Sequence, residues 1–130
     1  MSDPGHPASP QELMTECQNE LAHAWVVRAF VRHSDEADEF PEITEIGRAV
    51  FDLTRALETR AGEPDAYFRM LRKKLGKFQT AIERFAEEAP RVSTHTNFQQ
   101  SVVSIRAVAA RLERLLEAGL ASSDSTRGSH

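Results

Sequence analysis

The apolar residues of this chain recur at intervals of three and four over long stretches that contain few glycines or prolines. This spacing places them on one face of an α-helix and does not fit the alternation of a β-strand. The sequence therefore predicts an all-α fold, a single four-helix up-down-up-down antiparallel bundle with short connections. Within a domain spanning residues 9–120, we expect helices at about 10–34, 42–61, 65–89 and 97–119.

Both ends of the chain are polar and are predicted to lie outside this domain. Residues 1–8 carry two prolines and a glycine, which is typical of a disordered lead-in. Residues 121–130 are predicted to be a disordered tail, and their closing Arg-Gly-Ser-His looks like the start of an affinity tag. Ser9 can cap the first helix, Pro10 suits its first turn and Glu12 completes a capping box.

Breaks in the apolar pattern define the predicted connections. Residues 35–42 are strongly acidic and predict either a solvated loop or a contact for a basic partner. Residues 61–65, Ala-Gly-Glu-Pro-Asp, interrupt the chain before the third helix. Pro90 is expected to stop that helix, and Gly119 lies near the expected end of the fourth.

The second, third and fourth predicted helices each carry one continuous apolar seam. Their near-heptad spacing predicts helix crossings of roughly 20°. We expect these seams to meet in a common core. They consist of Ile43, Ile46, Val50, Leu53, Leu57 and Ala61, then Tyr67, Leu71, Leu75, Phe78, Ile82, Phe85 and Ala89, and finally Phe98, Val102, Ile105, Ala109, Leu112, Leu116 and Leu120.

The first predicted helix differs because it is apolar on nearly every side in its second half. One stripe holds Leu13, Cys17, Leu21, Ala24, Arg28 and Val31, whereas other apolar residues lie around it. A helix that is apolar all round is usually buried all round. Either this helix is the most enclosed one, or a second subunit covers its outer face, with Trp25, Val26 and Phe30 as the candidate interface residues.

Arg28 stands on the stripe that should face the core. Burying a guanidinium is unfavourable by several kcal/mol unless it is paired and hydrogen-bonded. It is therefore predicted either to reach a carboxylate or backbone carbonyls, or to line a pocket for an anionic ligand. In an up-down bundle His33 and His95 would lie at the same end, so the candidate ligand-binding residues are Arg28, His33, His95 and Asn97.

No motif in the chain predicts a cofactor or a catalytic centre. Glu20 and His23 have the Glu-x-x-His spacing of di-iron bundles, but the chain contains no second copy of this motif. We therefore expect no metal site and no cofactor. Cys17 lies on the core stripe, where a buried thiol is a small apolar residue rather than a nucleophile.

Composition limits the partners that we expect. A net charge of −4 argues against a general nucleic-acid binder. One basic face, made by Arg69, Arg72, Lys73 and Lys77, predicts a solvated helix surface or a site for an anion or a partner. No apolar run is long enough for a membrane span, and the chain has one cysteine and no signal peptide. These features favour a cytoplasmic protein.

The segment Arg28-Ala-Phe-Val-Arg-His33 resembles the Arg-x4-His motif of the HEPN family. HEPN proteins are helical bundles that often act as RNases at a dimer interface. This resemblance implies a role in RNA cleavage for Arg28 and His33. An Asn or Asp often follows that arginine in the family, whereas this chain has Ala29.

Two further segments, His23-Ala-Trp-Val-Val-Arg-Ala-Phe-Val-Arg-His33 and Val92-Ser-Thr-His-Thr-Asn-Phe98, resemble a group of small bacterial four-helix proteins. Some of those proteins carry an amidohydrolase label. The resemblance implies that Trp25, Arg28, His33, His95 and Asn97 form one cluster. It does not extend to the label, because a metal-dependent amidohydrolase needs a large barrel and several metal ligands that this chain lacks.

These observations lead to one expected function and two alternatives. We expect a non-enzymatic helical protein that acts through protein contacts, either with another protein or as a homodimer through its first helix. The first alternative is binding of a small ligand, an anion or a metal around Arg28, His33 and His95. The second is a HEPN-like RNase.

Overall fold

The computed structural model describes residues 8–128, and these form helices without any β-strand. The all-α class predicted from the sequence is confirmed. The predicted lead-in, apart from Ala8, and the last two residues of the predicted tail lie outside the described residues. The elements are α1 (Pro10–Arg32), α2 (Asp35–Glu39), the 3-10 helix η1 (Pro41–Thr44), α3 (Glu45–Glu58), α4 (Pro64–Val92) and α5 (Thr96–Gly128).

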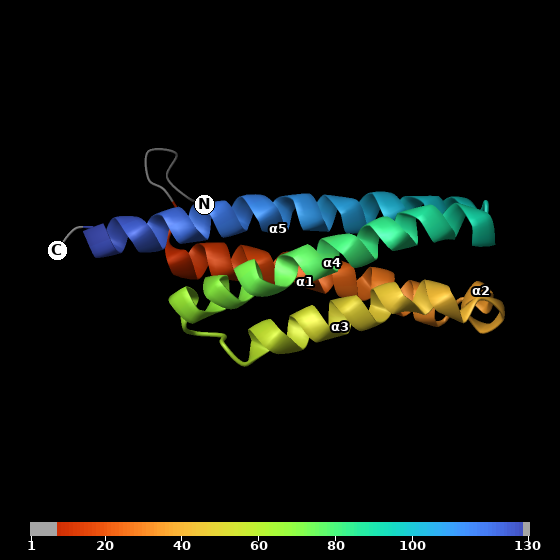
Figure 1. The fold of residues 1–130 in the computed structure, drawn as a ribbon, viewed down its shortest axis with the longest axis horizontal. Coiled ribbons are helices and arrows are strands. Elements are labelled where there is room, and N and C mark those ends of the chain that lie inside the picture. Colours follow the sequence, from red (N-terminus) through yellow and green to blue (C-terminus); the bar gives the residue numbers. More distant parts are fainter. Residues whose placement is uncertain (1–7, 129–130) are drawn as a thin grey trace.

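The four long helices lie side by side along the length of the molecule (Figure 1). α1 packs against α3 and α5, and α4 packs against the same two helices, so the four form a closed ring. The first and last long helices are therefore neighbours. The final part of α5 extends beyond the start of α1 at one end of the molecule (Figure 1).

The predicted seams form most of the core. Every seam residue of α4 is buried, as are Ile43 of η1 and the four seam residues that lie in α3. Ala61 is exposed because α3 ends at Glu58. In α5, Val102 and Leu120 are half-buried and the remaining seam residues are buried. Burial of these side chains removes apolar surface from water and is the main force that holds the helices together.

The acidic segment between α1 and α3 was predicted to be a loop. It is instead mostly helical. Ser34 caps α2, because its hydroxyl accepts a hydrogen bond from the backbone N–H of Ala37 at 3.3 Å and donates one to the carbonyl of Val31 at 2.6 Å. Acidic residues in the first turn favour a helix N-terminus. Ala37 and Ile43 are buried, so α2 and η1 are fixed against the core.

Two predicted helix ends are wrong. α4 continues through Pro90 to Val92, because a proline near the end of a helix removes only one hydrogen bond there and the amide of Ser93 still donates to the carbonyl of Ala89. α5 continues past Gly119 to Gly128, so the predicted tail is helical up to that residue. Among residues 8–128, the only glycine with a positive φ is Gly62, in the turn before α4.

α1 is not buried on every side. Its buried residues, among them Leu13, Cys17 and Val31, form one stripe, and the opposite face is exposed. The single chain does not enclose this helix, and its coverage by a second subunit stays a prediction. None of the helices in residues 8–128 is long and apolar enough to cross a membrane.

Candidate functional site

Arg28 lies on the side of α1 that faces α3, and the sequence predicted a buried charge at this position. It is half-buried, and its Cγ lies beside Gly47 of α3. A Cβ on residue 47 would stand 3.2 Å from Arg28 Cγ, so the missing side chain leaves room for the arginine stem. The stem is thereby covered while the guanidinium reaches the surface, which avoids the penalty of a buried charge.

The Arg28 guanidinium rests on aromatic rings. Its Cζ lies 4.4 Å from the ring centroid of Trp25 and 5.5 Å from that of Phe51. The guanidinium of Arg55 also lies over the Phe51 ring, with its Cζ 5.8 Å from the ring centroid. Among the described residues, no ion pair or hydrogen bond reaches Arg28. Cation–π contacts therefore replace the carboxylate partner that the sequence allowed. We call Trp25, Arg28, Phe51 and Arg55 the aromatic cluster.

A groove that carries several charged side chains adjoins the aromatic cluster toward η1, and Phe51 of the cluster lines it too. Its volume is about 560 Å³. Arg28 and Arg32 of α1 line one side, and Arg48 and Asp52 of α3 line the other, with Thr44 at one end. We call this the arginine groove. Three guanidinium groups against one carboxylate give it a local excess of positive charge, which suits an anion.

A second, more apolar cleft adjoins the cluster on the side away from η1. It lies between α1, α3 and the start of α4, and its volume is about 280 Å³. Leu21, Ala22 and Trp25 line it from α1, and Thr54, Leu57 and Tyr67 from the other two helices. We call this the apolar cleft. The α1–α3 side of the molecule thus carries an aromatic cluster flanked by one basic and one apolar depression.

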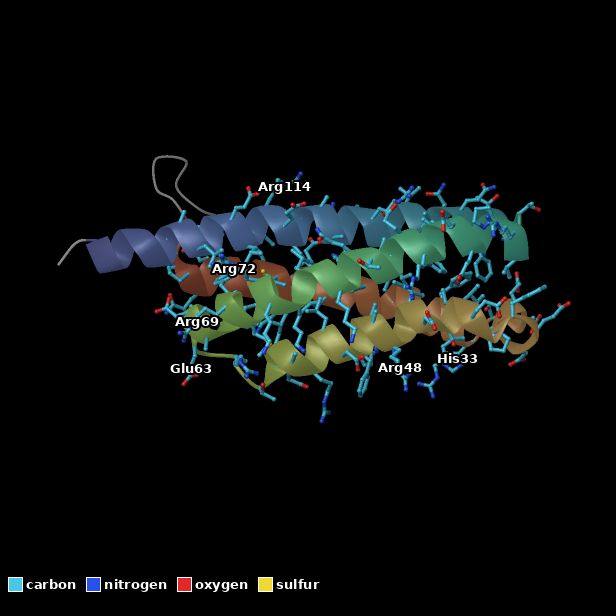
Figure 2. All side chains as sticks on the ribbon, viewed as in Figure 1. His33, Arg48, Glu63, Arg69, Arg72 and Arg114 are labelled. Atoms are coloured by element: carbon cyan, nitrogen blue, oxygen red, sulfur yellow. The ribbon has the colours of Figure 1, made fainter. Side chains whose placement is uncertain are left out.

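The predicted ligand residues do not all line one depression. His33 is exposed and does not line the arginine groove. In Figure 2, His33 and Arg48 lie on the edge of the molecule formed by α3. His95 lies at the α4–α5 connection, where its Nδ1 accepts a hydrogen bond from the backbone N–H of Asn97 at 3.1 Å. His95 therefore caps α5, and Asn97 contributes its backbone to that cap.

The RNase alternative stays a prediction. Arg28 and His33 both belong to the end of α1, but the guanidinium of Arg28 is held on the rings of the aromatic cluster and His33 is exposed to solvent. His33 does not line the groove that Arg28 lines.

The predicted interface residues differ in their surroundings. Val26 is 68% exposed and Trp25 is 38% exposed. Phe30 instead packs edge-on against Phe98 of α5, with ring centroids 5.0 Å apart. Phe30 therefore belongs largely to the packing of the single chain, whereas Val26 is free to meet a partner.

The predicted basic face is a solvent-facing surface of α4. Arg69, Arg72, Lys73 and Lys77 are all exposed, and their positions on the helix lie opposite the buried seam. Figure 2 shows Arg69 and Arg72 toward the start of α4, at the opposite end of the molecule from His33. This basic face is therefore separate from the arginine groove.

The environment of Cys17 keeps its thiol protonated. Burial, with the nearby carboxylates of Glu16 and Glu20, raises the pKa of Cys17 to about 12, so its thiol is protonated at neutral pH. A protonated thiol is a poor nucleophile and a poor metal ligand. No group of three His, Cys, Asp or Glu side chains in the described part of the chain could hold a metal ion.

Several residues of the α1–α3 side were not predicted as site residues from the sequence. Phe51 follows Val50 on α3. A large aromatic residue one position away from an apolar seam is a signal by which the sequence could have identified it. Arg32 and Arg48 are ordinary charged surface residues in sequence. Only the packing of α1 against α3 brings them together with Arg28.

Comparisons of the chain with protein-family models, with curated proteins and with solved structures gave no match. The resemblances seen in the sequence therefore remain predictions. The geometry of the α1–α3 side and of the outer face of α1 carries the functional argument.

Proposed function

We propose that this protein acts through protein contacts, as a homodimer formed over the outer face of α1. The observation that carries this proposal is Val26, which is 68% exposed in the middle of a helix face that has no strongly charged side chain. That face, which we call the outer stripe, consists of Thr15, Gln18, Ala22, Val26, Ala29 and His33.

The uncharged outer stripe favours a second copy of the same chain as the partner. In a two-fold dimer the same surface lies on both sides, so charges of one sign would repel one another. The outer stripe lacks Asp, Glu, Lys and Arg along the length of α1, whereas the outward face of α4 carries Arg69, Lys73 and Glu87. Copies can therefore meet at α1 without bringing like charges together.

Small side chains in the outer stripe favour close contact between the two helices. Ala22 and Ala29 lie one turn before and one turn after Val26 and allow two helix backbones to approach. Trp25 and Phe51, with rings 6.1 Å apart, lie beside the stripe and extend the apolar surface toward α3. Contiguous exposed apolar surface of this kind is typical of a protein interaction site.

The test is a measurement of mass by light scattering behind size exclusion, at a low and a high protein concentration. We expect the wild type to approach twice the monomer mass of 14.6 kDa. Val26→Asp places two negative charges at the centre of the contact, so we expect a folded monomer. Circular dichroism must show the same helix content in both proteins.

Val103→Asp is the matched control. Val103 is 59% exposed on α5, so the substitution is chemically the same and lies on another face. We expect this variant to remain dimeric. A wild type that stays at 14.6 kDa at every concentration would overturn the proposal, and so would equal dissociation of the Val26 and Val103 variants.

The arginine groove supports a second candidate function, binding of a small polyanion. Arg28, Arg32 and Arg48 line it, and Asp52 offsets only part of their charge. Planar guanidinium groups bind phosphate oxygens in pairs, and Thr44 adds a hydroxyl group at one end. This candidate retains Arg28 from the predicted ligand set and replaces the histidines by Arg32 and Arg48.

Calorimetric titration with inorganic pyrophosphate tests this candidate. We expect Arg48→Ala to weaken binding by about tenfold or more, because a charge-assisted contact contributes about 1.5 to 3 kcal/mol. Arg72→Ala removes the same charge from the separate basic face and should leave the affinity unchanged. Absence of binding by the wild type, or equal loss in both variants, would exclude a specific site.

We also propose that the four long helices form an up-down-up-down antiparallel bundle. The closed ring of contacts supports this, since each long helix packs on the two helices expected to be its neighbours. The short turn between Glu58 and Pro64 and that between Val92 and Thr96 favour antiparallel pairs. A cytoplasmic location is proposed with it, supported by the single buried cysteine.

A further inference from the structure

The apolar cleft contains a feature that packing alone does not explain. The hydroxyl oxygens of Thr54 and Tyr67 are buried and have no hydrogen-bond partner within the described part of the chain. Both residues line the cleft, and Tyr67 is only 1% exposed. An unpaired buried hydroxyl is unfavourable, and phenylalanine or valine would avoid this loss with nearly the same shape.

The surroundings of the two hydroxyls are apolar. Leu21, Leu57 and Ala61 contribute aliphatic surface, and Glu58 is the one ionisable side chain besides Tyr67 in the cleft lining. Cys17 lies close enough to Tyr67 for their charged forms to repel one another, and burial raises the pKa of both groups. A charged ligand would lose its hydration here without gaining an opposite charge at the floor of the cleft.

We infer that the apolar cleft binds a small uncharged molecule with an apolar body and one hydroxyl or carbonyl group, which hydrogen-bonds to Tyr67 and Thr54. The cleft volume of about 280 Å³ lies near the lower end of the range for ligand sites, so the molecule is small. A few convergent polar atoms in an apolar lining are the usual composition of such a site.

Access to the two hydroxyls requires a side-chain movement. Both oxygens are buried, although the two residues line the cleft. Gln18 lines the cleft and is exposed, so its side chain can turn away without disturbing the core. The ligand therefore replaces part of the cover over Tyr67 and supplies the hydrogen bonds that the hydroxyls lack.

The test compares two probes that differ by one hydroxyl group, 4-propylphenol and propylbenzene. Binding is followed by NMR through the methyl groups of Ala22, Thr54 and Ala61, with the exposed Ala110 of α5 as the reference. We expect the phenol to shift the three cleft methyl groups and to bind about tenfold more tightly than propylbenzene, since only the phenol satisfies the buried hydroxyls.

The double variant Tyr67→Phe/Thr54→Val identifies the source of this preference. We expect it to bind both probes almost equally, while its thermal midpoint is unchanged or higher because the unpaired hydroxyls are gone. Thr80→Val is the control, because that hydroxyl bonds to the Gly76 carbonyl on the outer surface of α4. This control should keep the preference for the phenol.

Ligand binding can be tested apart from self-association in the Val26→Asp variant, because Val26 does not line the cleft, whereas Gln18 and Ala22 of the outer stripe do. The probes should therefore bind to Val26→Asp with wild-type affinity. Unshifted cleft methyl groups, equal affinity of the wild type for both probes, or a preference that survives in the double variant would each overturn the inference.

Discussion

At the scale of single residues, Cys17 and Tyr67 show how burial changes the chemistry of a side chain. Cys17 has no exposed surface and Tyr67 has almost none, and they lie near each other under the apolar cleft. The low polarity around them disfavours both the thiolate and the phenolate. Burial is the largest contribution in each case, followed by the nearby acidic residues for Cys17 and by Cys17 itself for Tyr67.

This environment predicts that the protein loses stability in alkaline solution. The pKa of Cys17 rises from 9.0 in the unfolded chain to about 12 in the folded one. Between these values the unfolded state binds fewer protons, so the free energy of unfolding decreases as pH rises. Urea denaturation from pH 8 to pH 11 measures the slope. We expect a shallower slope for Cys17→Ala, whereas parallel slopes for the two proteins would show that Cys17 does not titrate in this way.

At the scale of the helices, Gly119 sets the distance between α5 and α4. A Cβ at this position would lie 2.6 Å from the ring of Phe68, which is itself buried. Glycine in a helix interior is unfavourable by about 1 kcal/mol relative to alanine. The close approach of the α5 backbone to the Phe68 ring offsets this loss, because it allows dense packing where the two helices meet.

Gly119→Ala should therefore destabilise the protein even though alanine is the better helix former. The ring of Phe68 cannot move without disturbing its neighbours, and overpacking of this kind costs about 1 to 3 kcal/mol. Chemical denaturation measures the change in the free energy of unfolding.

Gly76→Ala is expected to stabilise the protein, in contrast to Gly119→Ala. Gly76 lies on the exposed face of α4, and a Cβ there would meet no atom within 4 Å. This variant should gain about 0.5 to 1 kcal/mol from the lower flexibility of the unfolded chain. Stabilisation by both substitutions would contradict the role given to Gly119.

At the scale of the whole molecule, ion pairs at the surface join α5 to its two neighbours. Arg111 donates a hydrogen bond to Glu20 of α1 at 2.7 Å, and Arg106 makes two hydrogen bonds to Glu83 of α4. Arg106 also lowers the pKa of Glu83. Exposed pairs of this type contribute little stability, but they favour one register between helices whose apolar faces could slide.

The same packing leaves the outer stripe of α1 and the α1–α3 side open. α5 covers one flank of α1 and α3 covers the other, so the residues opposite the core face solvent. The proposed dimer would cover this remaining face. No residue of the outer stripe lines the arginine groove, whereas Gln18 and Ala22 belong both to the stripe and to the lining of the apolar cleft.

Apolar periodicity by itself determined most of the helices. The seams of α3 and α4 end up buried because a spacing of three and four residues fixes one face of a helix regardless of its partners. Helix ends were harder to predict. Pro90 and Gly119 are usual termination signals, but α4 continues to Val92 and α5 continues to Gly128. The acidic segment is helical, and burial of Ala37 and Ile43 in the core stabilises it in that form.

The composition of the candidate site was visible in the sequence only in part. Arg28, Trp25 and Val26 stood out because they break the pattern of a buried or a solvated helix face. Which atoms surround them depends on how α1 and α3 pack, and no local spacing encodes the contacts of Arg28 with Gly47 and Phe51. The sequence thus determined which faces are apolar, whereas the tertiary structure decided which polar groups meet and which are left without a partner.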